Sequence, residues 1–79
     1  MIKIEGNLIV SGNIRLENDI HVTGNLECKE IISSGKIIVD GSIVVFEKIE
    51  ATIIQIGKNS NIFYGILEGK LVRGWFFER

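Results

Sequence analysis

The sequence lacks proline, has a single cysteine, and contains no apolar run long enough to cross a bilayer. Because Cys28 is alone, an internal disulfide is excluded, and the simplest role for its thiol is that of a small buried hydrophobe. Residues 1–5 already alternate like a strand and do not have the form of a signal peptide. These absences argue against secretion and predict a cytoplasmic protein.

Histidine and net charge are equally scarce. His21 is the only histidine, so a three-histidine zinc site is excluded by count, and we interpret His21 as a solvated surface residue. Nine basic and ten acidic residues leave a net charge of −1, which gives no overall field to attract nucleic acid and favours self-association. The glycines beside Lys70 lack the spacing of a phosphate-binding loop. The sequence therefore predicts no enzyme, cofactor, metal or nucleic-acid partner.

The sequence does have a repeat of about six residues, in which a turn residue precedes two core-type apolar residues two positions apart. The pattern is continuous over residues 6–11, 12–17, 18–23 and 24–29, and it returns after shorter units at 35–40, 41–46 and 52–57. Because a unit of this size cannot bury its own apolar face, it must stack on copies of itself.

Three units together give a longer period, which is visible in the spacing of Gly6, Gly24, Gly41 and Lys58. Six residues at about 3.3 Å each span about 20 Å, which is a short strand and a corner. Three such units therefore close one triangular turn of a parallel β-helix. The general preference of parallel crossovers favours a right-handed coil.

The predicted fold is all-β: one parallel β-helix domain over residues 1–79, triangular and right-handed, with about four coils. Regular coils are expected over about 2–72, followed by an aromatic tail over 73–79. An antiparallel barrel or meander is the alternative, because strands separated by Gly-Asn or Ser-Gly also form hairpins. That alternative does not explain why apolar identity repeats best at the three-unit period, with no connection deviating by more than one residue.

Stacking at this period predicts three ladders of inward side chains, with glycine at corners that need a positive φ. The ladders are Leu8, Leu26 and Ile43 with Val10, Cys28 and Val45; Ile14 and Leu16 over Ile49 and Ala51; and Ile2, Ile20, Ile37 and Ile54 with Ile4, Val22, Val39 and Ile56. Ile9 and Val44 fall at outward positions of one face and Ile38 on another, which leaves lateral contact open.

The two ends of this solenoid carry the main functional signal, because a bare terminal coil shows unpaired N–H and C=O groups. The first strand is expected from Ile2 through Ile4, with nothing before it in this sequence to cover it. The regular pattern decays towards the C-terminus and finishes in Trp75, Phe76 and Phe77. This cluster is expected to plug the core, to form an end-to-end joint, or to anchor the protein at a membrane surface. These five residues form the hypothesised polymerisation interface.

Residues 6–14, GNLIVSGNI, and 51–67, ATIIQIGKNSNIFYGIL, resemble the core of the bactofilins, which are polymer-forming cytoskeletal proteins, mainly bacterial. The resemblance covers about residues 2–72 and consists of a loose pattern of glycine and alternating aliphatic residues. It implies a right-handed triangular β-helix that assembles end to end, without nucleotide, into non-polar filaments. It carries over no catalytic residues. Bactofilins commonly have more coils, and they usually have flexible tails that often contain proline. This sequence shows neither such tails nor any proline.

We therefore predict a non-enzymatic structural protein that forms homopolymeric cytoskeletal filaments in the cytoplasm. Peripheral contact with the inner face of the membrane through the C-terminal aromatic residues is an additional expectation. One alternative is a small β-solenoid binding or oligomerisation module that forms discrete oligomers. Another is a fragment of a hexapeptide-type acyltransferase, although those enzymes have left-handed coils and need a histidine in a subunit cleft, a role that only His21 could fill.

Overall fold

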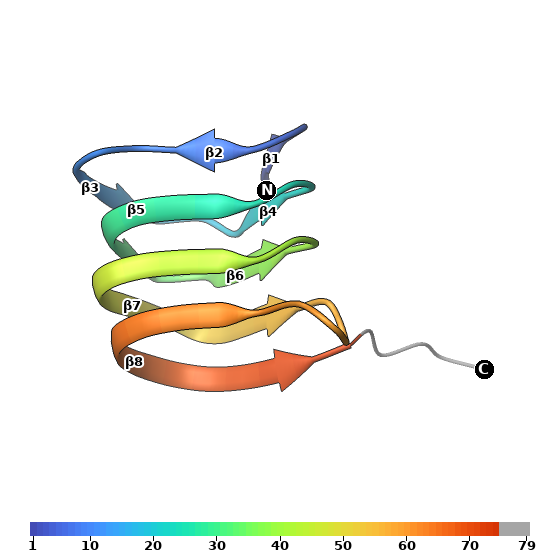
Figure 1. Cartoon of the computed structure of the whole chain (residues 1–79). Coiled ribbons are helices and arrows are strands. Elements are labelled where there is room, and N and C mark those ends of the chain that lie inside the picture. Colours follow the sequence, from blue (N-terminus) through green and yellow to red (C-terminus); the bar gives the residue numbers. More distant parts are fainter. Residues whose placement is uncertain (75–79) are drawn as a thin grey trace.

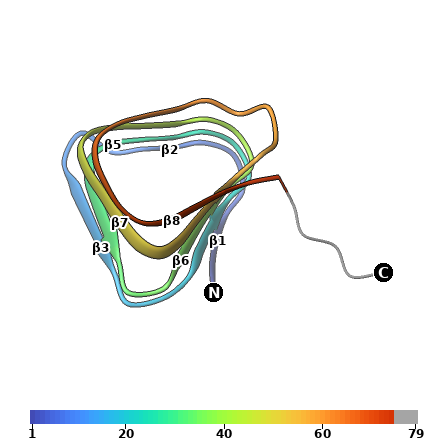
Figure 2. The ribbon, with the colours of Figure 1, turned by 90° about the horizontal axis from the view of Figure 1, so that it is seen from below.

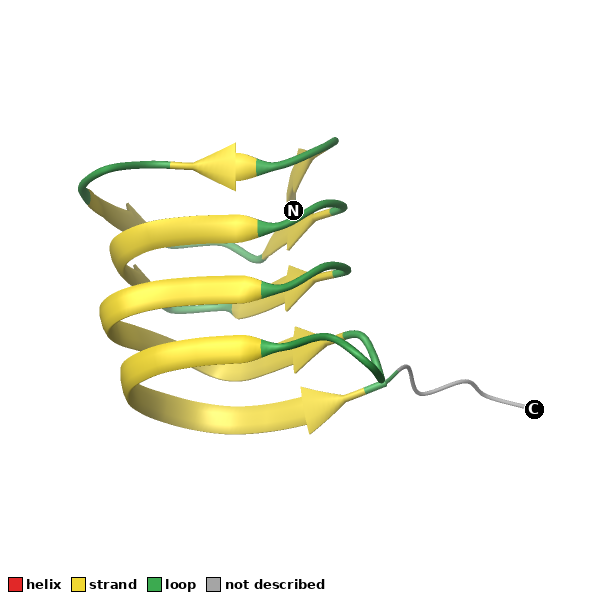
Figure 3. Ribbon diagram, viewed as in Figure 1, coloured by secondary structure: helices red, strands yellow, loops and turns green. Residues whose placement is uncertain are grey.

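The computed structural model describes residues 1–74, which form a β-solenoid without any helix (Figures 1 and 3). The strands are β1 (Ile2–Ile4), β2 (Leu8–Ile9), β3 (Asn13–Leu16), β4 (Ile20–Val22), β5 (Leu26–Ser33), β6 (Lys36–Val39), β7 (Ile43–Ile56) and β8 (Ile62–Arg73). All their pairings are parallel, which confirms the predicted class and excludes the antiparallel alternative. Within the described residues, no helix is long and apolar enough to cross a membrane.

The coils are triangular and stack on three faces (Figure 2). The β1 face stacks β1, β4, β6 and the ends of β7 and β8; the β2 face stacks β2 on the beginnings of β5, β7 and β8; and the β3 face stacks β3 on their middle parts. In Figure 1 the chain runs leftward in front along β2 and returns behind along β3 while it descends, which is a right-handed turn. On the β1 face, the predicted period leads from Ile2 through Ile20, Ile37 and Ile54 to Leu71.

Inward side chains from the three faces form one continuous apolar core. On the β1 face, Ile20, Ile37 and Ile54 occupy consecutive rungs and are at most 2% exposed, which confirms the predicted ladder. On the β3 face, Ile31 lies between Ile14 and Ile49, so a unit that interrupts the six-residue repeat still supplies a core residue. Ser33, the only buried polar residue among those described, satisfies its hydroxyl by donating to the Asn18 carbonyl at 2.8 Å.

Most corner glycines are present for a reason other than the predicted one. Only Gly6, Gly69 and Gly74 have a positive φ among the described glycines, so Gly24 and Gly41, which follow Gly6 at the same corner, do not need one. A Cβ atom on Gly41 would instead lie 2.2 Å from Asn25 Oδ1 and 2.6 Å from the backbone oxygen of the preceding coil's glycine. Glycine is required there because the preceding coil passes too close for any side chain.

A ladder of polar side chains runs along the corner between the β1 and β2 faces. The Asn25 amide donates to Asn7 Oδ1 and the Ser42 amide donates to Asn25 Oδ1, both at 2.8 Å. The Asn61 amide continues the series by donating to Ser42 Oγ at 3.4 Å. Each side chain therefore binds the backbone of the following coil, which holds neighbouring coils in one register.

The last coil departs from the regular period. Leu26 is the partner of Ile43 and Ile43 is the partner of Ile62, so the second of these steps is two positions longer than the first. The extra residues lie in the corner at 57–61, which projects beyond the other corners in Figure 2. The expectation that no connection deviates by more than one residue is therefore wrong at this corner.

Candidate functional site

The N-terminal end of the solenoid is open in the described structure. β1 pairs only with β4, and β2 and β3 pair only with β5, so one edge of each strand has no partner within residues 1–74. Ile2 is 36% exposed and Ile4 is half-buried, whereas Ile20 and Val22 directly beneath them are buried. The other inward residues of this coil, Leu8, Val10, Ile14 and Leu16, are also half-buried. The first coil thus exposes both strand edges and core side chains.

The C-terminal end is also open, since β8 pairs only with β7 among the described strands. Ile62, Leu67 and Leu71 are half-buried core residues, and Tyr64, which stacks on buried Val45, is 42% exposed. Arg73 occupies the position that follows Ile56 in its ladder. An aliphatic ladder therefore ends in a cation at this corner of the last coil.

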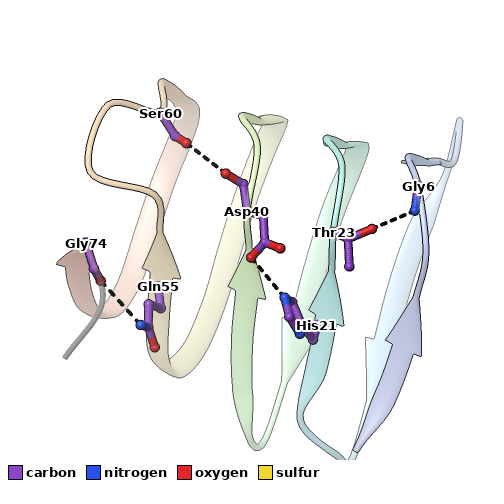
Figure 4. A network of polar contacts seen from close by, with 7 residues as sticks. All are labelled: Gly6, His21, Thr23, Asp40, Gln55, Ser60 and Gly74. Atoms are coloured by element: carbon purple, nitrogen blue, oxygen red, sulfur yellow. Dashed lines mark hydrogen bonds and ion pairs between the residues drawn. The ribbon is translucent and has the colours of Figure 1, made fainter. Parts of the chain in front are cut away.

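Hydrogen bonds hold the end of the last coil to its own projecting corner and to the coil above. The Arg73 guanidinium donates to the Ser60 carbonyl of the projecting corner. The Gly74 amide donates to the Ile56 carbonyl at 2.9 Å, and the Gln55 side-chain amide donates to the Gly74 carbonyl at 3.3 Å (Figure 4). The described part of the last coil is therefore fastened by its own contacts.

Three large apolar side chains, here named the side patch, are exposed on the side of the last two coils. Phe46, Phe63 and Ile66 are 58%, 60% and 57% exposed. Phe63 pairs with Val44 on the β2 face, Ile66 pairs with Lys48 on the β3 face, and Phe46 lies between these two faces in β7. This patch was not predicted from the sequence, although the alternation of Ile62, Phe63 and Tyr64 along one strand places Phe63 outward. The placement of Ile9 and Val44 on one face and Ile38 on another is confirmed by the strand register.

His21 is not the unpartnered residue that the sequence suggested. Its Nε2 lies 2.9 Å from Asp40 Oδ1 on the following coil, and the two side chains are 25% and 37% exposed (Figure 4). The contact joins two coils on the outside of the solenoid. Among the described residues, no group of three or more His, Cys, Asp or Glu side chains could hold a metal ion.

A depression of about 430 Å³ lies elsewhere, on the β3 face. It is lined by residues that include Arg15, Glu17, Ile32 and Glu50, and His21 is not among them. The depression and the His21–Asp40 pair therefore do not form a common site.

Two titratable groups are perturbed by their surroundings. Burial, followed by the charge of Glu30, raises the pKa of the Cys28 thiol to about 11, so this thiol stays protonated at neutral pH. The hydrogen bond that the Lys48 amine donates to Glu50 is the main cause of a raised pKa at Lys48, whose Nζ lies 3.1 Å from Glu50 Oε1 and 3.6 Å from Glu68 Oε1. Cys28 is 1% exposed and agrees with its predicted role as a buried hydrophobe.

Only part of the hypothesised polymerisation interface lies within the described residues. Ile2 and Ile4 lie at the open edge of the first coil, while Trp75, Phe76 and Phe77 lie outside the described residues. The predicted boundary of the regular coils at residue 72 is extended by one residue, because β8 ends at Arg73. Comparison with protein-family models, curated proteins and solved structures gives no match for this chain.

Proposed function

We propose that the protein is a cytoskeletal building block of the bactofilin type, which assembles end to end into filaments without nucleotide. One observation carries this proposal: both terminal coils leave strand edges and core side chains uncovered in the described structure. Unpaired edges of a parallel sheet accept another strand, and exposed aliphatic side chains gain free energy when they are buried.

The free energies of burial and of association indicate how strong such a joint is. Eight apolar side chains of the terminal coils pack against the core but remain partly exposed. If each gains about 0.5–1 kcal/mol on burial, they contribute about 4–8 kcal/mol together. Association costs about 4–15 kcal/mol, so burial alone only balances the lower part of this range. Backbone hydrogen bonds, each worth about 0.5–1.5 kcal/mol, must supply the surplus, and assembly should depend on protein concentration.

The experiment compares an inward and an outward lysine in the first coil. Ile4→Lys places a charge in the joint and should convert filaments into short oligomers or monomers. Ile9→Lys makes the same change at a position that is 67% exposed and should leave filaments intact. Negative-stain microscopy and sedimentation without nucleotide measure the outcome. A wild-type protein that stays monomeric at high concentration, at both low and physiological salt, would contradict the proposal.

A discrete oligomer is the second candidate function, and the side patch favours it. Phe46, Phe63 and Ile66 offer an apolar surface that does not depend on the ends. If the patch joins a small number of copies, light scattering should give a fixed mass, and Phe63→Ser should reduce it to the monomer. Filaments that persist in Phe63→Ser would exclude this role.

We propose a cytoplasmic location, with peripheral contact at the inner face of the membrane through Trp75, Phe76 and Phe77. Aromatic residues beside arginine suit the boundary between headgroups and acyl chains. Co-sedimentation with anionic vesicles, compared between the full chain and a chain ending at Gly74, tests this contact. The acyltransferase alternative is not proposed, because the coil is right-handed (Figures 1 and 2) and His21 pairs with Asp40 and does not line the depression on the β3 face.

A further inference from the structure

We infer that the copies join head to tail, with the first coil of one copy continuing the strand ladders of the last coil of another. This inference rests on the proposed end-to-end assembly and adds the identity of the two surfaces and their register. The resulting filament is polar, which differs from the non-polar filaments that the resemblance to bactofilins implies.

Three core ladders support this register because they can continue across the joint with aliphatic residues on both sides. Inside the molecule, each rung of the β1 face places one branched aliphatic residue on another, from Ile2 to Leu71. In the continuing register, Leu71 of one copy meets Ile2 of the next, Ile62 meets Leu8, and Leu67 meets Ile14. All six side chains are partly exposed in the single copy and would become interior rungs.

The polar ladder at the corner between the β1 and β2 faces is directional, and this gives a second, independent argument. Asn7 Oδ1 accepts from the Asn25 amide of the following coil and fills the space beside Gly24, where a Cβ atom would lie 2.2 Å from it. At the open N-terminal end, Gly6 has a positive φ, unlike Gly24, and apart from its chain neighbours no atom lies within 4 Å of its Cβ position. Asn61 holds the same ladder position at the other end. A head-to-tail joint would place Asn61 against Gly6 and Asn7 of the next copy as Asn7 lies against Gly24 and Asn25.

Charge bears on one of the two non-polar joints. With the Met1 amine, the first coil carries three cations and three carboxylates, whereas the side chains of the last described coil are three cations and one carboxylate: Lys3, Arg15, Glu5, Glu17 and Asp19 against Lys58, Lys70, Arg73 and Glu68. Joining two C-terminal ends opposes two cationic coils, while a head-to-tail joint brings a cationic coil against a neutral one. The arrangement of charges therefore selects against the joint of two C-terminal ends.

One ion pair follows from the register. On the β3 face, Arg15, Ile32, Glu50 and Glu68 are successive partners, so the next partner of Glu68 is Arg15 of the joined copy. The Lys48 amine lies 3.1 Å from Glu50 and 3.6 Å from Glu68, and Arg15 would extend this cluster to four charged groups. The least favourable rung places Ile4 against Arg73, whose guanidinium is already held at the Ser60 carbonyl.

Cysteine cross-linking tests the register directly. Stacked partners lie about 4.8 Å apart, within the Cα separation of about 4.4–6.8 Å that a disulfide allows. Oxidised Arg15→Cys/Glu68→Cys should therefore give a series of covalent oligomers, and mixing the two single variants should give only mixed dimers. The native Cys28 is 1% exposed and should not contribute.

Each single variant, oxidised alone, tests whether two like ends meet. Dimers of Arg15→Cys alone would show that like N-terminal ends meet, and dimers of Glu68→Cys alone would show that C-terminal ends meet; either result overturns the inference. If the double variant forms polymers but gives no cross-link on oxidation, the proposed register is wrong. Sedimentation of the same variants under reducing conditions separates this failure from that of the proposed function, since monomers alone would overturn both.

Charge exchange gives a test without cysteine. Arg15→Glu and Glu68→Arg should each raise the protein concentration needed for assembly by about threefold or more, and the double exchange should restore it to about the wild-type value. Lys36→Glu, an exposed change in an internal coil, is the matched control and should have little effect. Equal effects of the single and double exchanges would contradict the Arg15–Glu68 contact.

Discussion

Single residues at the corners decide how closely one coil can follow another. Gly24 and Gly41 each lie against the asparagine side chain of the preceding coil, so glycine and asparagine form a unit that spans two coils. The asparagine oxygen occupies the space of the missing Cβ and binds the next backbone amide. Substitutions at such a corner should therefore act by steric overlap, whereas an open corner should tolerate them.

Gly41→Ala should destabilise the protein by about 1–3 kcal/mol, because its Cβ would overlap Asn25 Oδ1 and the Gly24 carbonyl. Gly12→Ala is the matched control, since Gly12 lacks a positive φ and has no atom within 4 Å of a Cβ position. This control should be neutral or slightly stabilising. Chemical denaturation measures both, and equal losses would show that the clash at Gly41 is relieved elsewhere.

The buried thiol of Cys28 should make stability depend on pH at the alkaline end. Folding raises its pKa to about 11, so the unfolded chain ionises first and the free energy of unfolding should fall as pH rises from about 9 to about 11. Below this window the contribution is constant. In Cys28→Ala, which has no thiol, this part of the slope should disappear, and the difference between the two proteins isolates it from the lysines and Tyr64. An unchanged slope would show that the thiol is free to ionise in the fold.

At the scale of elements, each strand is stable only through the strands above and below it. β6 has four residues and lies between β4 and β7, with Ile37 and Val39 completely buried. A strand of this length has no independent stability. Loss of one inward side chain should therefore affect two interfaces at once.

Ile37→Ala should lower the free energy of unfolding by about 2–5 kcal/mol, because it removes a buried branched side chain and leaves a cavity between coils. For an exposed histidine without a partner, His21→Ala would cost under about 0.5 kcal/mol. Because His21 binds Asp40, we expect a cost of up to about 1 kcal/mol. Denaturation of both variants gives the comparison. A His21 effect as large as that of Ile37 would show that the outer hydrogen bond, and not the core, dominates the contact between coils.

The sequence repeat predicted most strand positions, because stacked strands recur at the period of the repeat. The ladder through Ile20, Ile37 and Ile54 follows from identity at equal intervals in the sequence, without knowledge of any side-chain contact. Ile31 was missed because its unit has five residues, and a bulge in the strand absorbs the difference. The projecting corner at 57–61 was missed because Lys58 and Asn59 form a turn outside the stack, which the spacing of glycines does not reveal.

The candidate site was less predictable for physical reasons. The open edges at Ile2 and Ile4 follow from the fold alone, since a solenoid has two ends. The His21–Asp40 contact and the side patch at Phe63 depend instead on side-chain reach across a corner, which periodicity does not encode. The polar ladder from Asn7 to Asn61 was visible as a repeated residue type, but its direction required the hydrogen bonds.

At the scale of the whole molecule, the described residues form a column whose two ends differ from its middle. The middle coils are covered on both sides by neighbouring coils, whereas the first coil ends in aliphatic side chains and the last described coil adds Tyr64 and Arg73 to its aliphatic residues. The contribution of residues 75–79 can be tested against this arrangement, because the last coil is fastened through Arg73, Gly74 and Gln55.

A chain ending at Gly74 should remain folded but lose filaments if Trp75, Phe76 and Phe77 belong to the joint. Circular dichroism and denaturation report the fold, and sedimentation reports assembly. If the aromatic residues instead plug the core, the truncated chain should lose the last coil, seen as a smaller dependence of unfolding on denaturant. Filaments of unchanged length and stability would remove these residues from both roles.

The stacking of one coil directly on the next also determines how the molecule folds. Every pair of partner residues is separated by one coil of the chain and no more, so no contact has to wait for a distant part of the sequence. Loop closure is equally easy at each step, and folding can spread from any pair of neighbouring coils. During synthesis, each new coil can dock as soon as it leaves the ribosome. The partly made chain therefore presents the same kind of open edge as the finished molecule. If the ends join as proposed, nascent copies on one messenger RNA would be exposed to premature joining from the second coil onward.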